Sequence, residues 1–175
     1  MFEIQPMNAD DYRQRTRRST VMIALIFLAL AMALSTAAVT LFGEPGGDNL
    51  RFNIGGVFAA VLIMAGLMRK VFWHQAWMAP AVYSWKLTRS LMSITNVWLL
   101  LKAAVEAGDP DAMRLLRFYH LGLSQMHQLD GNSSDDAQLH RDMQEHQARM
   151  EALGIDTRQT RLDPAWLDAL KGAAR

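Results

Sequence analysis

The chain has 175 residues, no cysteine and a formal net charge of +1, with 51% hydrophobic and 20% charged residues. This length favours a single domain, and the near-neutral charge argues against nucleic acid as a partner. The lack of cysteine excludes disulfides, thiolate nucleophiles and cysteine-based zinc sites.

The first 20 residues form a basic segment ahead of a long apolar run, Val21–Phe42, which holds no charged residue. Its arginines are Arg13, Arg15, Arg17 and Arg18. As a helix the run measures roughly 33 Å, against about 30 Å for the hydrocarbon core of a bilayer. A cleaved signal peptide ending near Ala37 is the rival interpretation, but its apolar core would be only about 7–15 residues long. We therefore expect a retained span.

A second apolar run, Phe52–Met68, measures roughly 25 Å as a helix, which is the low end for a span. Arg69 and Lys70 extend it, because their long stems reach the headgroups. A short Gly- and Pro-rich loop separates the runs, so we expect a transmembrane helical hairpin over 21–68, with spans at about 21–42 and 52–68. Residues 69–80, which include Trp73 and Trp77, are expected to lie along the membrane surface.

Small residues recur at every fourth position in both runs, a spacing that lets helices approach closely in lipid. They are Ala29, Ala33 and Ala37 in the first run, and Gly55 with Ala59 and Gly56 with Ala60 in the second. The alternative is that alanine is simply common in bacterial spans. Neither run is charged, which favours an anchor over a transporter. Because most flanking basic residues lie outside the short loop, the positive-inside rule predicts that both termini are cytoplasmic.

The rest of the chain, 81–175, is expected to form a cytoplasmic antiparallel helical bundle, which makes the fold class all-α. Turn and capping residues predict helices at about 81–107, 110–129, 134–153 and 164–173. These residues are Gly108, Asp109 and Pro110, Gly131 with a restart near Ser133 or Ser134, Gly154, and Asp163 with Pro164. We expect no β-strand.

Three of these helices carry an apolar stripe with steps of three and four residues, which is the pattern of a packing seam. The stripes are Leu87, Leu91, Ile94, Trp98, Leu101 and Val105; Ala112, Leu116, Tyr119, Leu123 and Met126; and Leu139, Met143, His146, Met150 and Leu153. We expect Trp98 to be buried against Tyr119 or Leu123, and Thr95 to face water. The same seam could instead recruit a second chain.

No sequence motif predicts a catalytic residue, a cofactor or a metal site. His120 and His127 share a helix face but lie about 10.5 Å apart along the axis, too far for one zinc ion. The stretch from Asp130 has Asp135 and Arg141 where a calcium loop needs Gly and Glu. The stripe Arg114, Arg117, His120, Ser124 and His127 could meet an anionic lipid headgroup, but we expect it to be the solvated side of its helix. The candidate functional face consists of Arg117, Tyr119, His120, His127 and Asp130.

The chain contains, in this order, a basic N-terminus, a two-span hairpin, the segment MAPAVYSWKLTRSL and the segment LLRFYHLGLSQMHQLDGN. This order resembles an uncharacterised bacterial membrane-protein family, domain of unknown function 3087. The resemblance covers roughly residues 1–135 and is most specific over 115–132. It implies a multi-pass protein of the bacterial inner (plasma) membrane and supplies no reaction. The family tends to have a second Tyr where His120 stands and paired acids where Asp130 and Gly131 stand, which argues against His120 as a required catalyst.

Two classes of function remain open. The preferred one is a non-enzymatic interaction or scaffold module, anchored in the lipid bilayer, whose partner is an unknown protein or a second copy. The alternative is a membrane-associated enzyme or metal-dependent protein that uses the His120/His127 face. A deep pocket gathering His120, His127, Asp130 or Tyr119 would favour the alternative, and a solid bundle with these residues scattered in solvent would favour the module.

Overall fold

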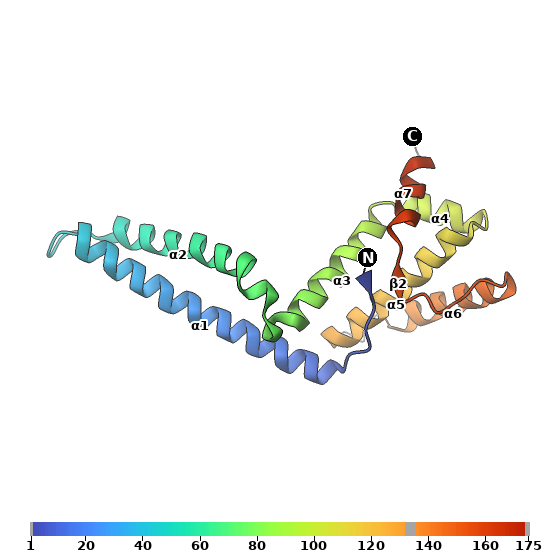
Figure 1. The fold of residues 1–175 in the computed structure, drawn as a ribbon, viewed down its shortest axis with the longest axis horizontal. Coiled ribbons are helices and arrows are strands. Elements are labelled where there is room, and N and C mark those ends of the chain that lie inside the picture. The colour runs from blue at the N-terminus through green and yellow to red at the C-terminus, as the bar shows by residue number, and fades with distance from the viewer. Residues whose placement is uncertain (1, 132–135, 174–175) are drawn as a thin grey trace. The chain divides into compact units, whose positions relative to one another are not determined.

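The structure is a computed structural model that describes residues 2–131 and 136–173, and these residues are predominantly helical (Figure 1). In chain order the elements are β1 (Phe2–Glu3), α1 (Ala9–Phe42), α2 (Leu50–Lys70), the 3-10 helices η1 (Phe72–His74) and η2 (Ala76–Met78), α3 (Ala79–Thr95), α4 (Trp98–Glu106), α5 (Pro110–Asp130), α6 (Asp136–Ala152), β2 (Arg161–Leu162) and α7 (Pro164–Ala173). The predicted helical class is confirmed, whereas the helix restart near Ser133 or Ser134 lies outside the described residues. The chain divides into two compact units, Gln14–Val82 and Met1–Arg13 with Tyr83–Arg175.

The unit Gln14–Val82 contains the two apolar helices predicted from the sequence. Both α1 and α2 are long and apolar enough to cross a membrane, by length and composition. In their most apolar stretches only 6% and 17% of the residues are buried inside the chain. The core helix of a soluble protein would be mostly buried, so the exposure of these apolar side chains distinguishes α1 and α2 from such a helix.

The helices α1 and α2 lie side by side (Figure 1) and touch where small residues allow it. The Ser35 hydroxyl donates to the Asn53 carbonyl at 3.0 Å. Gly56 lies so close to α1 that a Cβ there would be 2.5 Å from Ser35 Cα, and Ala60 next to it on the same face is fully buried. The small residues of α2 that matter are therefore Gly56 and Ala60, while Gly55 has no neighbour within 4 Å of a Cβ.

The predicted packing stripe of α1 is wrong. Ala29, Ala33 and Ala37 are exposed, and the buried alanine is Ala31. Alanines occur on several sides of α1, so the spacing of small residues cannot by itself select the side that meets α2.

Two short 3-10 helices follow α2, and a new α-helix begins at Ala79 with Pro80 in its first turn. Proline is suited to this position because its missing amide proton would have no partner there. The Ser19 hydroxyl of α1 donates to the Trp77 carbonyl at 2.7 Å, which holds η2 against the start of the first apolar helix. Pro80 thus lies in the first turn of α3 and not within a continuous helix that leaves the apolar run.

The second unit is built around α5, which packs against several helices. The Tyr83 hydroxyl of α3 donates to Gln125, Trp98 of α4 stacks on Tyr119, and α6 and α7 also contact α5. The largest fully buried side chains come from α3, α4, α5 and α6 and are Phe118, Leu87, Ile94, Leu101, Met113, Leu115, Leu129 and Met150. Helix α5 is thus a central helix without a fully solvated side, and this changes the environment of its polar residues.

The predicted continuous helix 81–107 is wrong, because the chain breaks between α3 and α4 at Asn96 and Val97. The predicted seam of this stretch is otherwise buried. Trp98 contacts Tyr119, with ring centroids 4.9 Å apart, but it is only half-buried, since the break rotates it relative to Ile94. Thr95 is exposed, as predicted.

The other two predicted stripes differ in outcome. On α5 only Ala112 of its stripe is fully buried, since helices pack on several sides and bury Leu115 and Phe118 instead. On α6 the stripe holds from Leu139 through His146 to Met150, and Leu153 lies exposed beyond the end of the helix.

A short antiparallel β-ladder contradicts the expectation of no β-strand. Phe2 pairs with Leu162 and Glu3 with Arg161, and the Ile4 amide donates to the Thr160 carbonyl at 2.8 Å. Two-residue strands have no detectable alternation, so the sequence pattern could not reveal them. We call residues 2–7 the N-terminal strap.

The strap is part of the core of the second unit. The Phe2 ring lies 5.5 Å from that of Tyr83 and 6.4 Å from that of Phe118. The Gln5 amide donates to the Tyr83 hydroxyl, and Ile4 and Met7 pack on the same core. The segment before the first apolar helix therefore folds with the segment that follows the second.

Candidate functional site

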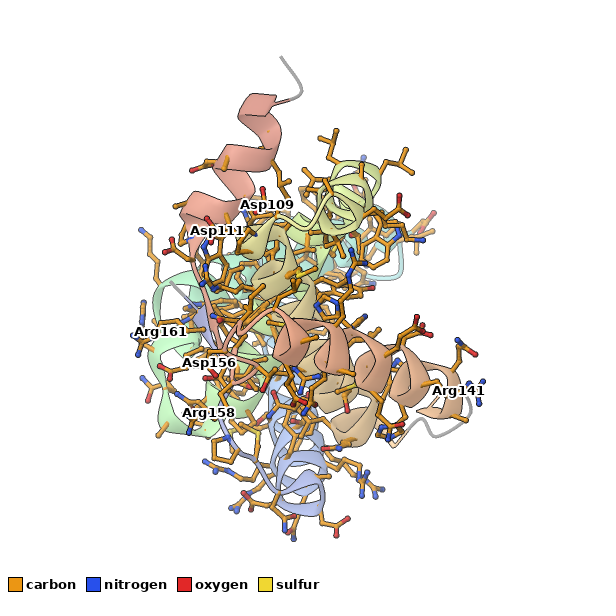
Figure 2. The ribbon with its side chains drawn as sticks, turned by 90° about the vertical axis from the view of Figure 1, so that its right-hand side faces the viewer. Asp109, Asp111, Arg141, Asp156, Arg158 and Arg161 are labelled. Atoms are coloured by element: carbon orange, nitrogen blue, oxygen red, sulfur yellow. The ribbon has the colours of Figure 1, made fainter. Side chains whose placement is uncertain are left out.

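Capping residues fix both ends of α5, the helix that carries all five candidate residues. The Asp109 carboxylate accepts from the amides of Asp111 at 2.8 Å and Ala112 at 3.2 Å, and Pro110 follows as the first helical residue. Figure 2 shows Asp109 and Asp111 together at this end of the helix. At the other end Gly131 adopts φ 71°, a conformation that favours glycine. Both predicted ends of this helix are confirmed to within one residue.

Arg117 lies between α5, α6 and the segment that follows α6. Its guanidinium donates to the Thr157 carbonyl at 3.0 Å, the Met143 carbonyl at 3.4 Å and the Gln147 side chain at 2.8 Å. The residue is only 8% exposed, and burial lowers the pKa of its guanidinium. Arg117 was expected on a solvated face; instead it ties three parts of the chain together.

His120 lies one turn beyond Arg117 and is 7% exposed, which also contradicts the expectation of a solvated face. Its ring meets that of His146 on α6 edge to face, with centroids 5.4 Å apart. His146 has a ring nitrogen, Nε2, 2.9 Å from the Met113 carbonyl, whereas the buried Nδ1 of His120 has no hydrogen-bond partner. The arrangement is a buried pair of imidazoles.

The surroundings of this pair favour neutral rings. Burial, followed by the His146 ring, lowers the pKa of His120 from its ordinary 6.5 to about 4, and Arg117 acts in the same direction. Burial also lowers the pKa of His146. The Asp142 carboxylate raises the pKa of His120, but it does not outweigh these effects. A positive charge here would be desolvated and would face a second cation, Arg117.

The other members of the candidate face point elsewhere. The Tyr119 ring packs against Trp98 of α4, and burial raises the pKa of its phenol. His127 is half-buried in the last turn, where its carbonyl accepts from the amide of the capping residue Gly131. Asp130 is exposed at the end of α5. The five residues therefore do not share one surface.

Among residues 2–131 and 136–173, no group of three or more His, Cys, Asp or Glu side chains is close enough to hold a metal ion. The apolar spacing of α6 predicts His146 in a packing seam, but it does not reveal the pairing of His146 with His120. The contact of Arg117 with the Thr157 carbonyl could not be predicted either, because every residue type has a backbone carbonyl and the sequence does not mark which one accepts.

The His120–His146 pair predicts a pH-dependent stability. Between pH 6.5 and about 4 the unfolded chain binds a proton at His120 that the folded chain does not. Stability should therefore fall as the pH falls through this window, by on the order of 3 kcal/mol from His120. Thermal unfolding of the full chain between pH 7.5 and 4.5 measures this loss.

The matched variants are His120→Gln, which removes a buried imidazole, and His140→Gln, which changes an exposed one. We expect His120→Gln to flatten the dependence and His140→Gln to keep it. An equally steep dependence in His120→Gln would contradict the assignment.

The model of the family described as Protein of unknown function (DUF3087) matches residues 2–167. No curated protein and no solved structure matched the chain.

Proposed function

This chain belongs to the family Protein of unknown function (DUF3087), and we propose that it is a membrane-anchored interaction module. In this proposal α1 and α2 span the bacterial inner membrane as a hairpin, and the helical unit around α5 is cytoplasmic. The segment 69–80 lies along the membrane surface. The helical unit binds a protein partner or a second copy of the chain.

The observation that carries the anchor is the exposure of the two apolar helices. Large apolar side chains such as Leu25, Phe58 and Leu62 are 61%, 63% and 59% exposed. Leaving many such side chains in water would be unfavourable, whereas lipid accommodates them at no cost.

The N-terminal strap supports two spans over a cleaved signal peptide. Phe2, Ile4 and Met7 pack on the core of the helical unit, and Tyr12 is part of that core. Removing residues 1–37 would take these side chains away from the folded protein. Because residues before α1 and after α2 fold together, the ends of the two helices that join this unit must emerge on the same side of a membrane.

The charge distribution supports a cytoplasmic location of that side. Within residues 14–82 the acidic residues are Glu44 and Asp48, both in the loop between α1 and α2. Five of the six basic residues stand at the other ends of the helices, namely Arg15, Arg17, Arg18, Arg69 and Lys70. Basic residues near span ends favour the cytoplasmic face.

We favour binding over catalysis because the candidate polar residues are used inside the fold. Arg117 and His120 are buried, and Arg117 makes hydrogen bonds to three partners. Conversely, Met92, Leu99 and Leu100 of α3 and α4 are 60%, 83% and 37% exposed. Exposed aliphatic side chains of this kind are suited to an interface with another protein.

Reporter fusions test the proposal in intact bacteria. A reporter after Gly46 should be active outside the cytoplasm, and one after Arg175 should be active inside it. The protein should resist carbonate extraction from isolated membranes. After purification it should retain residues 1–37. A mature N-terminus near Ala38 would overturn the anchor.

The same cells test the binding part of the proposal. A photoreactive amino acid at the exposed Leu99 should give a discrete crosslinked species, either with another protein or with a second copy. The control position is Gln144, which is exposed and polar on α6. Absence of a discrete product at Leu99, or the same products at both positions, would contradict an interface on α3 and α4.

A further inference from the structure

A pocket of about 360 Å³ lies between the start of the first apolar helix and η2. Its α1 wall consists of Arg15, Arg18, Ser19 and Met22, and its other wall of Ala76 and Trp77. The four α1 residues follow the spacing i, i+3, i+4 and i+7, so they lie on one face of the helix. We call this the Arg15–Trp77 pocket.

The pocket is built by specific contacts within the unit Gln14–Val82. The hydroxyl of the buried Ser19 lies 2.7 Å from the Trp77 carbonyl and 2.9 Å from the Arg15 carbonyl, which joins the two walls. The Phe72 ring packs against the Trp77 ring, with centroids 5.4 Å apart, and so supports the indole from behind. The walls are therefore held at a fixed spacing, as a binding site requires.

The charge of the pocket fits an anion. Two arginines line it and no acidic residue does, so the lining carries a net positive charge; Asp11, the nearest acidic residue in the sequence, lies one turn before Arg15 and outside the lining. Guanidinium groups pair with phosphate oxygens through two parallel hydrogen bonds. The exposed side chains of Arg15 and Arg18, on adjacent turns, can reach the same anion.

The pocket changes from basic to apolar along the helix axis. Arg15 and Arg18 precede the uncharged run that starts at Val21, and Met22 lies inside that run, roughly 10.5 Å from Arg15 along the axis. Trp77 lies opposite, and tryptophan is enriched at the level of lipid headgroups. A phospholipid has the same order of groups, with a phosphate followed by glycerol and acyl carbons.

We propose that the Arg15–Trp77 pocket binds the headgroup phosphate of an anionic phospholipid, with Arg15 and Arg18 pairing with phosphate oxygens and Met22 and Trp77 contacting the glycerol and first acyl carbons. This inference rests on the proposed membrane anchor. It adds a site of defined lipid preference to an anchor that apolar helices alone would leave indifferent to lipid type.

Native mass spectrometry of the full chain in mild detergent tests this site. The probes are dioleoyl phosphatidylglycerol, dioleoyl phosphatidylcholine and the soluble sn-glycerol 3-phosphate at equal concentrations. We expect one retained phosphatidylglycerol. Arg15→Gln with Arg18→Gln should lower its retention by roughly 30-fold, at about five-fold for each arginine beside an anionic lipid. Arg15→Lys with Arg18→Lys keeps the charge and should keep most of the retention.

The matched control removes the same charge outside the pocket, through Arg17→Gln with Arg69→Gln. This pair should change retention far less than the Arg15 and Arg18 pair does, since neither residue lines the pocket. Equal losses in both pairs would overturn the site in favour of diffuse attraction. Equal retention of both lipids, or retention of glycerol 3-phosphate as strong as that of the lipid, would overturn it as well.

Carbonate extraction distinguishes failure of the proposed lipid site from failure of the proposed membrane anchor. A chain that stays in the membrane but shows no lipid preference contradicts the pocket alone. A chain that is extracted contradicts the proposed function.

Discussion

Replacing Phe118 with alanine should lower the free energy of unfolding by about 3–5 kcal/mol, the usual cost of truncating a fully buried aromatic side chain. Phe118 is 0% exposed and lies on the central helix α5, where its ring meets that of Phe2 edge to face. The loss removes contacts to α5 neighbours and to the N-terminal strap at the same time. For a unit of roughly 100 residues we expect the melting temperature to fall by more than about 10 °C.

The measurement is thermal unfolding of the full chain in detergent, because a fragment starting after α2 would lack Phe2, Ile4 and Met7 of the core. The control is Leu99→Ala, which truncates a large apolar side chain that is 83% exposed. It should change stability by less than about 0.5 kcal/mol. Similar effects of the two substitutions would contradict the central position of α5.

Replacing Gly56 with valine should force α1 and α2 apart. A Cβ at this position would lie 2.5 Å from Ser35 Cα and 2.6 Å from Ser35 N, and backbone atoms cannot rotate away as a side-chain tip can. Overpacking usually costs about 1–3 kcal/mol, and a contact with backbone atoms places this site at or above the upper end. Gly55→Val is the matched control, since a Cβ there meets nothing within 4 Å.

The absence of cysteine allows a direct measurement of this separation. Ser35→Cys with Asn53→Cys places one thiol on each helix, at the two residues joined by the hydrogen bond from the Ser35 hydroxyl to the Asn53 backbone carbonyl. A short bifunctional thiol reagent should join them efficiently in membranes and in the Gly55→Val background, and several-fold less in the Gly56→Val background. Equal yields in both backgrounds would show that Gly56 does not set the approach of the helices.

Helix ends were predictable from the sequence where local capping chemistry determines them. Asp109 with Pro110 starts α5, Gly131 ends it, and Asp163 with Pro164 starts α7, each because a side chain or a backbone conformation satisfies groups within a few residues. The break between α3 and α4 contains no Gly or Pro, so the sequence did not predict it. The apolar character of α1 and α2 was predictable because it depends on composition alone.

The environment of the candidate site was not predictable, because it depends on what surrounds α5. A polar stripe with Arg117 and His120 is typical of a solvated helix face when one other helix covers the opposite side. Here α6 and the segment after it cover that stripe as well, and Thr157 and His146 supply contacts from distant parts of the chain. Tertiary packing, which the helical period does not encode, decides the role of these residues.

The pairing of β1 with β2 also imposes an order on biosynthesis. Phe2 and Glu3 leave the ribosome before both apolar helices, but their partners Arg161 and Leu162 are made only after them. The ladder therefore cannot form until Arg161 and Leu162 have been made, and the strap must stay unpaired while α1 and α2 are synthesised. A nascent chain whose apolar helices fail to insert would keep residues 2–3 and 161–162 unpaired and available to chaperones and proteases.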